Sequence, residues 1–300
     1  MLHASRNRAF TLIELLIVIA IIALLVSILL PVLSGVRKAA FQTREMAGLS
    51  QLGMGYASYS NDNRDKLMPG YLRGSWAAES GRKFIAYDEP EHPSEENRIV
   101  STPLRPYTWR MMPYMNFAYE VMFADRTLRS LINERPRDMA DRTAFHTSVA
   151  RNPSFGMNTT FVGGDAHRGG FTPAALLRFG AFYVTRMDQP AHSDRLITFT
   201  TARGILRDTG GQKVPGYHRI EAPWHATPTS NSVPAFIPWT GPRGKFDPNL
   251  DTTAYGHVDF RHAGKAGVLT FDAHAELLGI DKLVDMTRWC NKATRADWHP

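Results

Sequence analysis

The sequence predicts an α+β fold in which a long N-terminal helix packs on an antiparallel β-sheet with loop insertions. Three observations predict it. Residues 15–36 form an uncharged apolar run, apolar residues then recur at helical spacing up to residue 60, and short β-type runs lie in the second half of the chain.

The composition is that of a folded chain. Of its 300 residues, 43% are apolar and 21% are charged. The net charge is +7, but the 35 basic and 28 acidic residues are mixed along the chain, so a nucleic-acid-binding arm is not expected. Cys290 is the single cysteine, which excludes an intrachain disulfide.

The N-terminal segment predicts a membrane anchor. A short leader with His3, Arg6 and Arg8 precedes 22 uncharged residues, close to the roughly 20 that span a bilayer as a helix. A cleaved secretory signal has an apolar stretch of only about 7–15 residues, and no A-x-A site follows this run. The basic leader predicts that residues 1–9 stay in the cytoplasm and that the remainder lies outside.

Glu14 stands at the edge of this apolar run and has two interpretations. A carboxylate in hydrocarbon costs roughly 2.5–3.5 kcal/mol on insertion scales unless it is paired. Glu14 is either an interfacial residue at the start of the helix, where it suits the helix dipole, or a residue with a dedicated partner.

Residues 8–16, Arg-Ala-Phe-Thr-Leu-Ile-Glu-Leu-Leu, resemble the signal of type IV prepilins and type II secretion pseudopilins. The resemblance implies cleavage between Ala9 and Phe10, N-methylation of Phe10, and the role of the family glutamate for Glu14. Ala9 stands where the family usually has Gly, and Pro31 stands where many pilins have a kinking proline. The implied partner for this step is a prepilin peptidase and methyltransferase.

Physical chemistry gives Glu14 a role within this resemblance. Cleavage would create a positive amine on Phe10, and opposite charges about 4 Å apart attract strongly in a low dielectric. The Phe10 amine of an incoming subunit would then satisfy Glu14 of its neighbour. Such a pair would fix the axial register of otherwise interchangeable apolar helices, as single polar groups do in coiled coils.

The expected organisation is a leader (1–9), a transmembrane and assembly helix (10–33), its amphipathic continuation (34–60) and an extracytoplasmic globular domain (61–300). In residues 34–60 we expect Leu49, Leu52, Tyr56 and Tyr59 to form a core-facing stripe and Arg37, Lys38, Arg44 and Glu45 to form the polar side. Gly48, Gly53 and Gly55 are expected to permit close packing on a sheet.

The globular domain gives weaker signals. An amphipathic helix is expected after Pro113, with its apolar residues Phe117, Val121, Leu128 and Leu131 facing inward. Strands are expected at 182–186, 196–201, 268–271 and 276–280. Residues 215–248 hold seven prolines with Trp224 and Trp239, which predicts a long surface insertion. Those two tryptophans either pack or stack on a sugar or a secreted partner.

A second, looser resemblance covers this domain. A large group of bacterial prepilin-like proteins shares a W…PY segment, a SYGMN-like segment and a C-terminal R-H-x-G…DGH strand pair. The corresponding residues here are Trp109 with Pro113-Tyr114, the segment 154–158, and Arg261-His262-Ala263-Gly264 with Asp272-Ala273-His274. Phe155 replaces Tyr, and Ala273 replaces Gly at a turn where a positive φ would strain alanine.

One constellation has the residue types of a metal site. His257, Asp259, His262, Asp272 and His274 suit zinc, but hydrogen bonds that lock a β-hairpin are the favoured interpretation of the last three, and no cofactor is expected. C-x-x-C, H-E-x-x-H, G-x-S-x-G and phosphate-binding glycine loops are absent, and Cys290 has no nucleophile signature, so no enzyme activity is expected.

The function that these patterns favour is a structural subunit of a type II secretion pseudopilus or a type IV pilus-like filament, in a specialised or minor role. It would be a single-pass inner-membrane protein with a cytoplasmic N-terminus and a periplasmic or extracellular domain. Its partners would be itself, other pilin-like subunits and an inner-membrane assembly platform. Two alternatives remain: a binding module for nucleic acid, polysaccharide or a secreted partner, and a static membrane-anchored surface protein.

Overall fold

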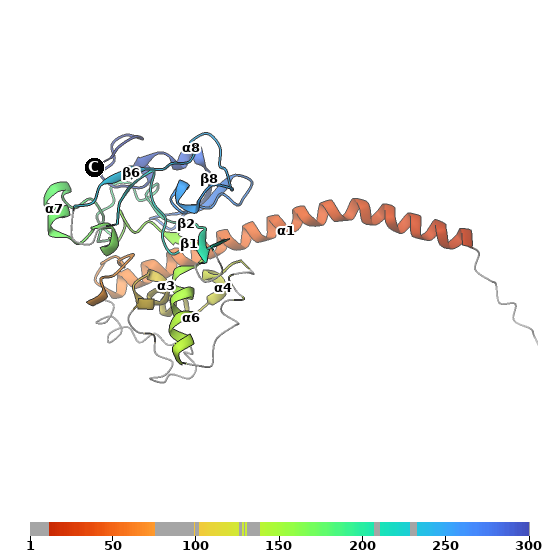
Figure 1. The fold of residues 1–300 in the computed structure, drawn as a ribbon, viewed down its shortest axis with the longest axis horizontal. Helices are drawn as coiled ribbons and strands as arrows, with labels where there is room; N and C mark the ends of the chain where they lie inside the picture. The colour runs from red at the N-terminus through yellow and green to blue at the C-terminus, as the bar shows by residue number, and fades with distance from the viewer. Residues whose placement is uncertain are drawn as a thin grey trace, which may run out of the picture. The chain divides into compact units, whose positions relative to one another are not determined.

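The computed structural model confirms the α+β fold. It describes residues 12–75, 99, 102–125, 128, 130, 139–206, 211–228 and 233–299, and the chain divides into two compact units, residues 1–44 and 45–300. The long first helix, α1, spans Leu12–Asp62 (Figure 1).

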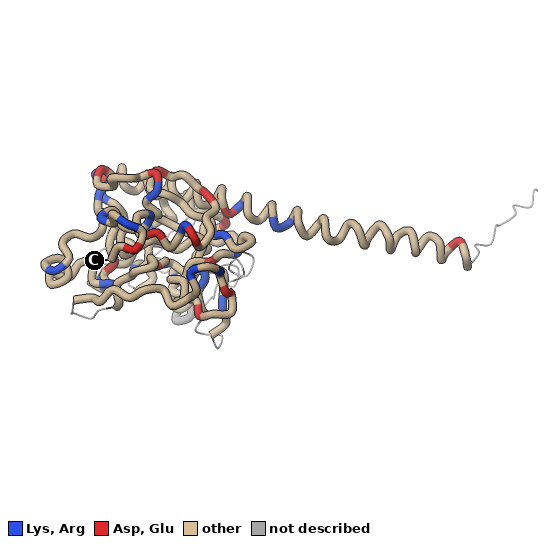
Figure 2. Tube along the Cα trace, turned by 90° about the horizontal axis from the view of Figure 1, so that it is seen from above, with Lys and Arg blue, Asp and Glu red and all other residues tan. Residues whose placement is uncertain are grey.

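The first unit consists of the N-terminal part of α1. Its charges are confined to the two ends, with Glu14 in the first turn and Arg37 and Lys38 beyond the apolar run (Figure 2). Large apolar side chains from Leu12 to Val36 are all exposed in this unit, and the helix continues through Pro31. A helix that shows apolar side chains on every face is suited to a lipid or protein environment rather than to water.

The second unit is built on a four-stranded antiparallel sheet of order β1-β2-β7-β8. The strands are β1 (Phe155–Met157), β2 (Ile197–Thr201), β7 (Lys265–Thr270) and β8 (Ala275–Gly279). Three of the four expected strands are therefore confirmed. The strand expected at 182–186 is wrong, because Val184 and Arg186 form only isolated bridges, with Val162 and Lys66.

The C-terminal part of α1 lies in the core of this unit. Its predicted stripe, Leu49, Leu52, Tyr56 and Tyr59, is buried as expected. Gly53 allows a close approach to the sheet, since a Cβ at this position would lie 3.0 Å from the Ala273 Cβ and 3.1 Å from Leu269 Cδ2. The expectation that a glycine brings the helix close to the sheet is thus confirmed at Gly53.

Glu45 departs from the expected polar side of the helix, because it is fully buried. The sequence interpretation was wrong here for a physical reason. A charge on a helix is normally assigned to the solvated face, and only a partner remote in sequence makes its burial tolerable.

The helix expected after Pro113 is interrupted. The structure has α3 (Tyr107–Met111), the 3₁₀ turn η3 (Met112–Met115) and α4 (Tyr119–Met122). Asn116 and Phe117 between them have φ values of 52° and 54°, which a helix cannot accommodate. Of the residues expected to face inward, Leu128 is buried, Phe117 and Val121 are half-buried, and Leu131 lies outside the described residues.

The proline-rich stretch 215–248 lies at the surface only in part: its first half is largely buried, whereas many of the residues from 235 to 248 are exposed. It contains β5 (Trp224–Ala226) paired with β6 (Phe236–Pro238). A separate pair, β3 (Gly204–Leu206) with β4 (Gln212–Val214), precedes it in the chain. Residues 218–222 are buried, and so is Trp239, whereas Trp224 is half-buried. Proline composition suggested a loop, but the apolar and aromatic residues between the prolines fill part of the core.

The remaining elements are short helices. They are η2 (Thr102–Leu104), α6 (Met139–Arg151), η4 (Ala166–Arg168), α7 (Pro173–Phe179), η6 (Thr252–Tyr255), α8 (Ile280–Leu283) and η7 (Met286–Arg288).

Candidate functional site

The N-terminal processing region is only partly described. Ala9 and Phe10 lie outside the described residues, whereas Glu14 is exposed in the first turn of α1. Within the described part of the chain, α1 is the one helix long and apolar enough to cross a membrane. It fits a single-pass membrane anchor.

A buried ionic cluster joins α1 to the loop before β7. Glu45 Oε1 lies 3.0 Å from Arg261 Nη1, and Glu45 Oε2 lies 2.7 Å from His262 Nε2. Arg261 also pairs with Asp259, with Nε 2.9 Å from Oδ2, and donates to the carbonyl of Ala202. The paired Arg-His residues that resemble a family motif therefore hold a carboxylate of the first helix inside the core.

The turn between β7 and β8 is held by Asp272. Its Oδ1 accepts hydrogen bonds from Thr270 Oγ1 at 2.5 Å and from the backbone N–H of His274 at 3.1 Å. Ala273 at the tip has φ of 68°, which confirms the positive φ anticipated for this position. An L-residue with a Cβ is disfavoured in that region by about 1–2 kcal/mol.

The five candidate metal ligands do not gather at one point but take part in several different contacts. Asp259 and His262 belong to the Glu45 cluster, Asp272 caps its turn, and the side chain of His274 is exposed. His257 is buried, donates from Nδ1 to the carbonyl of Arg203 at 3.2 Å and stacks on Tyr217 with centroids 4.0 Å apart. Among the described residues, no group of three or more His, Cys, Asp or Glu is placed to hold a metal ion.

The expectation that His262, Asp272 and His274 lock a β-hairpin by hydrogen bonds holds only in part. Asp272 locks the β7–β8 turn through its side chain, and His274 contributes its backbone N–H and carbonyl. The His262 side chain instead reaches α1. The described geometry therefore gives the two histidines different structural roles.

The other motif residues lie in the core. Trp109 donates from Nε1 to the carbonyl of His146 at 2.9 Å, and Asn158 Nδ2 donates to the carbonyls of Ile197 and Trp289, each at 2.9 Å. The segment 154–158 contains strand β1. These contacts link distant parts of the chain, which accounts for the residue types without any ligand.

Sequence analysis missed a second buried ionic network. Arg219 Nε lies 2.8 Å from Asp165 Oδ2, which also accepts from Thr159 Oγ1 at 2.5 Å. Arg168 pairs with Glu221, whose other oxygen lies 3.2 Å from His225 Nε2. A signal was present for Arg219 and Glu221, which stand among apolar and aromatic residues, but nothing local in the sequence identifies their partners.

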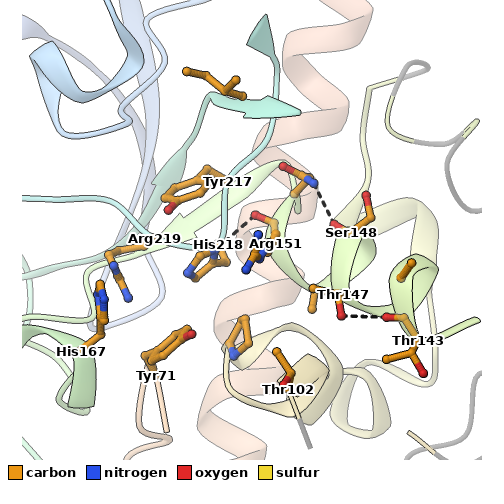
Figure 3. A pocket seen from close by; sticks show the side chains of 15 residues that line it. Tyr71, Thr102, Thr143, Thr147, Ser148, Arg151, His167, Tyr217, His218 and Arg219 are labelled. Atoms are coloured by element: carbon orange, nitrogen blue, oxygen red, sulfur yellow. Dashed lines mark hydrogen bonds between the residues drawn. The ribbon is translucent and has the colours of Figure 1, made fainter. Parts of the chain in front are cut away.

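A cavity of about 610 Å³ lies beside this network (Figure 3). Helix α6 supplies Thr143, Thr147, Ser148 and Arg151 on one side, while Tyr71, His167 and Arg219 lie opposite and His218 lies between them (Figure 3). Tyr217 covers the top in this view. Sequence reasoning did not find this cavity, because its walls come from segments far apart in the chain.

Burial sets the charge of the histidines around this cavity. It lowers the pKa of His218 well below the usual value, lowers that of His257 to about 3 and that of His225 to about 4. Neighbouring arginines lower these pKa values further, since a second positive charge disfavours protonation. These imidazoles are therefore neutral near pH 7.

Comparison with known proteins identifies the N-terminal segment. Residues 4–30 match the family model described as the prokaryotic N-terminal methylation motif, the prepilin-type cleavage and methylation region. Neither the curated proteins nor the solved structures gave a significant match.

Proposed function

We propose, from the prepilin-type methylation motif at residues 4–30, that the chain is a structural subunit of a type II secretion pseudopilus or a type IV pilus-like filament. The motif implies processing by a prepilin peptidase and assembly with other pilin subunits. The observation that carries the proposal is that this motif opens a helix whose large side chains from Leu15 to Val36 are all apolar and exposed.

In this proposal Ala9, Phe10 and Glu14 each have a role in processing or assembly. Cleavage after Ala9 would free the amine of Phe10, and Glu14 of a neighbouring subunit would accept it. Because the exposed apolar side chains form similar surfaces around the helix, van der Waals packing alone would tolerate several axial registers. A charge pair at one level selects one of them.

The same proposal sets the location and the class of protein. The basic leader would remain in the cytoplasm, the helix would lie in the inner membrane, and residues 45–300 would lie outside. The proposed role is structural rather than catalytic. The motif residues Trp109, Asn158 and His262 support it, because all three make contacts within the core.

Replacement of Glu14 by Leu tests the assembly role. Insertion should be unchanged or easier, since a carboxylate is removed from the apolar run. Cleavage should continue, because the residues at the cut are intact, while sheared filaments should become few. Ser27→Leu, an equally exposed polar-to-apolar change in the same helix, is the matched control and should assemble normally. Parental filament yield from Glu14→Leu would overturn the proposal.

Glu14→Gln distinguishes charge from shape. The amide keeps the size of the carboxylate and can still accept a hydrogen bond, but it carries no charge. Assembly should be impaired, although less than in Glu14→Leu. Membrane fractionation and the cleaved fraction, measured in the same cultures, show whether any loss of filaments arises earlier.

A further inference from the structure

The cavity beside α6 is positively charged. Its lining includes Arg151 and Arg219, and none of the described residues that line it is Asp or Glu. Arg219 is compensated by buried Asp165, but the exposed Arg151 guanidinium makes no ion pair with the described residues. The uncompensated charge favours a ligand with an anionic group.

A second cavity extends this basic surface. It has a volume of about 410 Å³, shares Tyr71 and His167 with the first, and adds Arg73 and Arg105. Among the described residues its lining too has no Asp or Glu. The second cavity therefore enlarges the space that is open to a ligand held in the first.

His218 lines the first cavity without adding a charge to it. The residue is buried, and Nδ1 lies 3.2 Å from the backbone oxygen of Arg151. Because a carbonyl oxygen only accepts, Nδ1 carries the proton and Nε2 of the neutral ring is an acceptor. Nε2 has no hydrogen-bond partner among the described residues and is closed off from solvent, so His218 offers the cavity an uncharged ring rather than an open hydrogen-bonding atom.

The two tyrosine rings are poorly suited to stacking on nucleobases. Tyr217 already stacks on His257 and lies 4.5 Å from His218, centroid to centroid. Tyr71 carries the Arg219 guanidinium 5.1 Å from its centroid and lies 5.8 Å from His218. Single-stranded nucleic acid is bound by aromatic rings with free faces. What these tyrosines offer instead is their hydroxyl groups.

We propose that this cavity binds a carboxylated saccharide, such as a uronic acid unit of an acidic polysaccharide. The exposed Arg151 guanidinium receives the carboxylate of the sugar. Threonine and tyrosine hydroxyls of the lining complete a surface suited to a polyhydroxylated ring. A cavity of about 610 Å³ lies in the size range of small-molecule sites. The site belongs to the unit 45–300, so it does not depend on filament assembly.

Calorimetric titration of the detergent-solubilised full chain with trigalacturonic acid tests the proposal. We expect saturable binding that Arg151→Gln weakens about tenfold, as loss of a charge-assisted hydrogen bond predicts. Arg243→Gln removes an exposed arginine that does not line the cavity, and it should stay within about twofold of the parent.

Two further ligands make the result decisive. Maltotriose, which has hydroxyls but no carboxylate, should bind at least about tenfold more weakly than the acidic trimer. Absence of saturable binding by the acidic trimer, or equal weakening by Arg151→Gln and Arg243→Gln, would overturn the proposal. Tighter binding of an oligothymidylate that Arg151→Gln abolishes would also overturn it and assign the cavity to nucleic acid.

Discussion

Glu45 Oε2 lies 2.7 Å from His262 Nε2, with both side chains buried, so a carboxylate of the first helix is held by the loop that precedes β7. Arg261 holds the other oxygen of the same carboxylate at 3.0 Å. Buried ion pairs of this kind contribute little net stability compared with apolar packing, but loss of one partner leaves the others desolvated and unpaired. The cluster therefore fixes the axial position at which α1 packs on the sheet.

Glu45→Ala should lower the free energy of unfolding of the unit 45–300 by about 3–5 kcal/mol, because two buried cationic or polar partners lose their acceptor. Denaturation of the detergent-solubilised chain, followed by tryptophan fluorescence, measures this, since all six tryptophans lie beyond residue 75. The matched control is Glu120→Ala at an exposed position, with an expected change within about 0.5 kcal/mol. Equal effects of the two variants would argue against the cluster.

Ala273→Gly should stabilise the same unit by about 1 kcal/mol, because glycine adopts the φ of 68° without the steric cost that alanine bears. Ala275→Gly, in the extended strand β8, should instead destabilise, since there glycine only adds backbone freedom to the unfolded chain. The two thermal midpoints should therefore move in opposite directions. Destabilisation by both variants contradicts a strained turn.

Stability should fall as the pH is lowered from about 6.5 toward 4. Burial keeps the pKa of His257 at about 3 and that of His225 at about 4, so the unfolded chain binds protons in this window while the folded chain does not. Each such histidine adds at most about 1.4 kcal/mol per pH unit to the slope of the unfolding free energy against pH.

His257→Asn isolates one of these contributions. Asparagine does not titrate, tolerates the φ of 64° and can donate to the carbonyl of Arg203. The slope of unfolding free energy against pH between 4 and 6 should decrease, whatever the variant does to stability at pH 7. An unchanged slope shows that His257 protonates equally in the folded and unfolded chains.

The sequence predicted those features that depend on local periodicity. The helix up to residue 60, its buried stripe with Leu49 and Tyr56, and strands β7 and β8 follow from spacings of three to four or of two. The turn strain at Ala273 was predictable only from the resemblance, which has glycine at this position of the turn.

Other features depend on partners remote in sequence. Glu45 is a residue type that normally lies on the solvated face of a helix. Its burial is explained only by its partners Arg261 and His262. The break at Asn116 and Phe117 lies within a helix-like pattern that tertiary packing overrides. The cavity beside His218 joins segments whose proximity no local pattern encodes.

Mass spectrometry of the N-terminus in cells that contain a prepilin peptidase tests the central claim most directly. The account predicts that the mature chain begins with N-methylated Phe10, so that the peptides from residues 1–9 are missing and the first peptide carries one added methyl group. Recovery of the uncleaved chain, with the Ala9-Phe10 bond intact in the dominant membrane form, would contradict it.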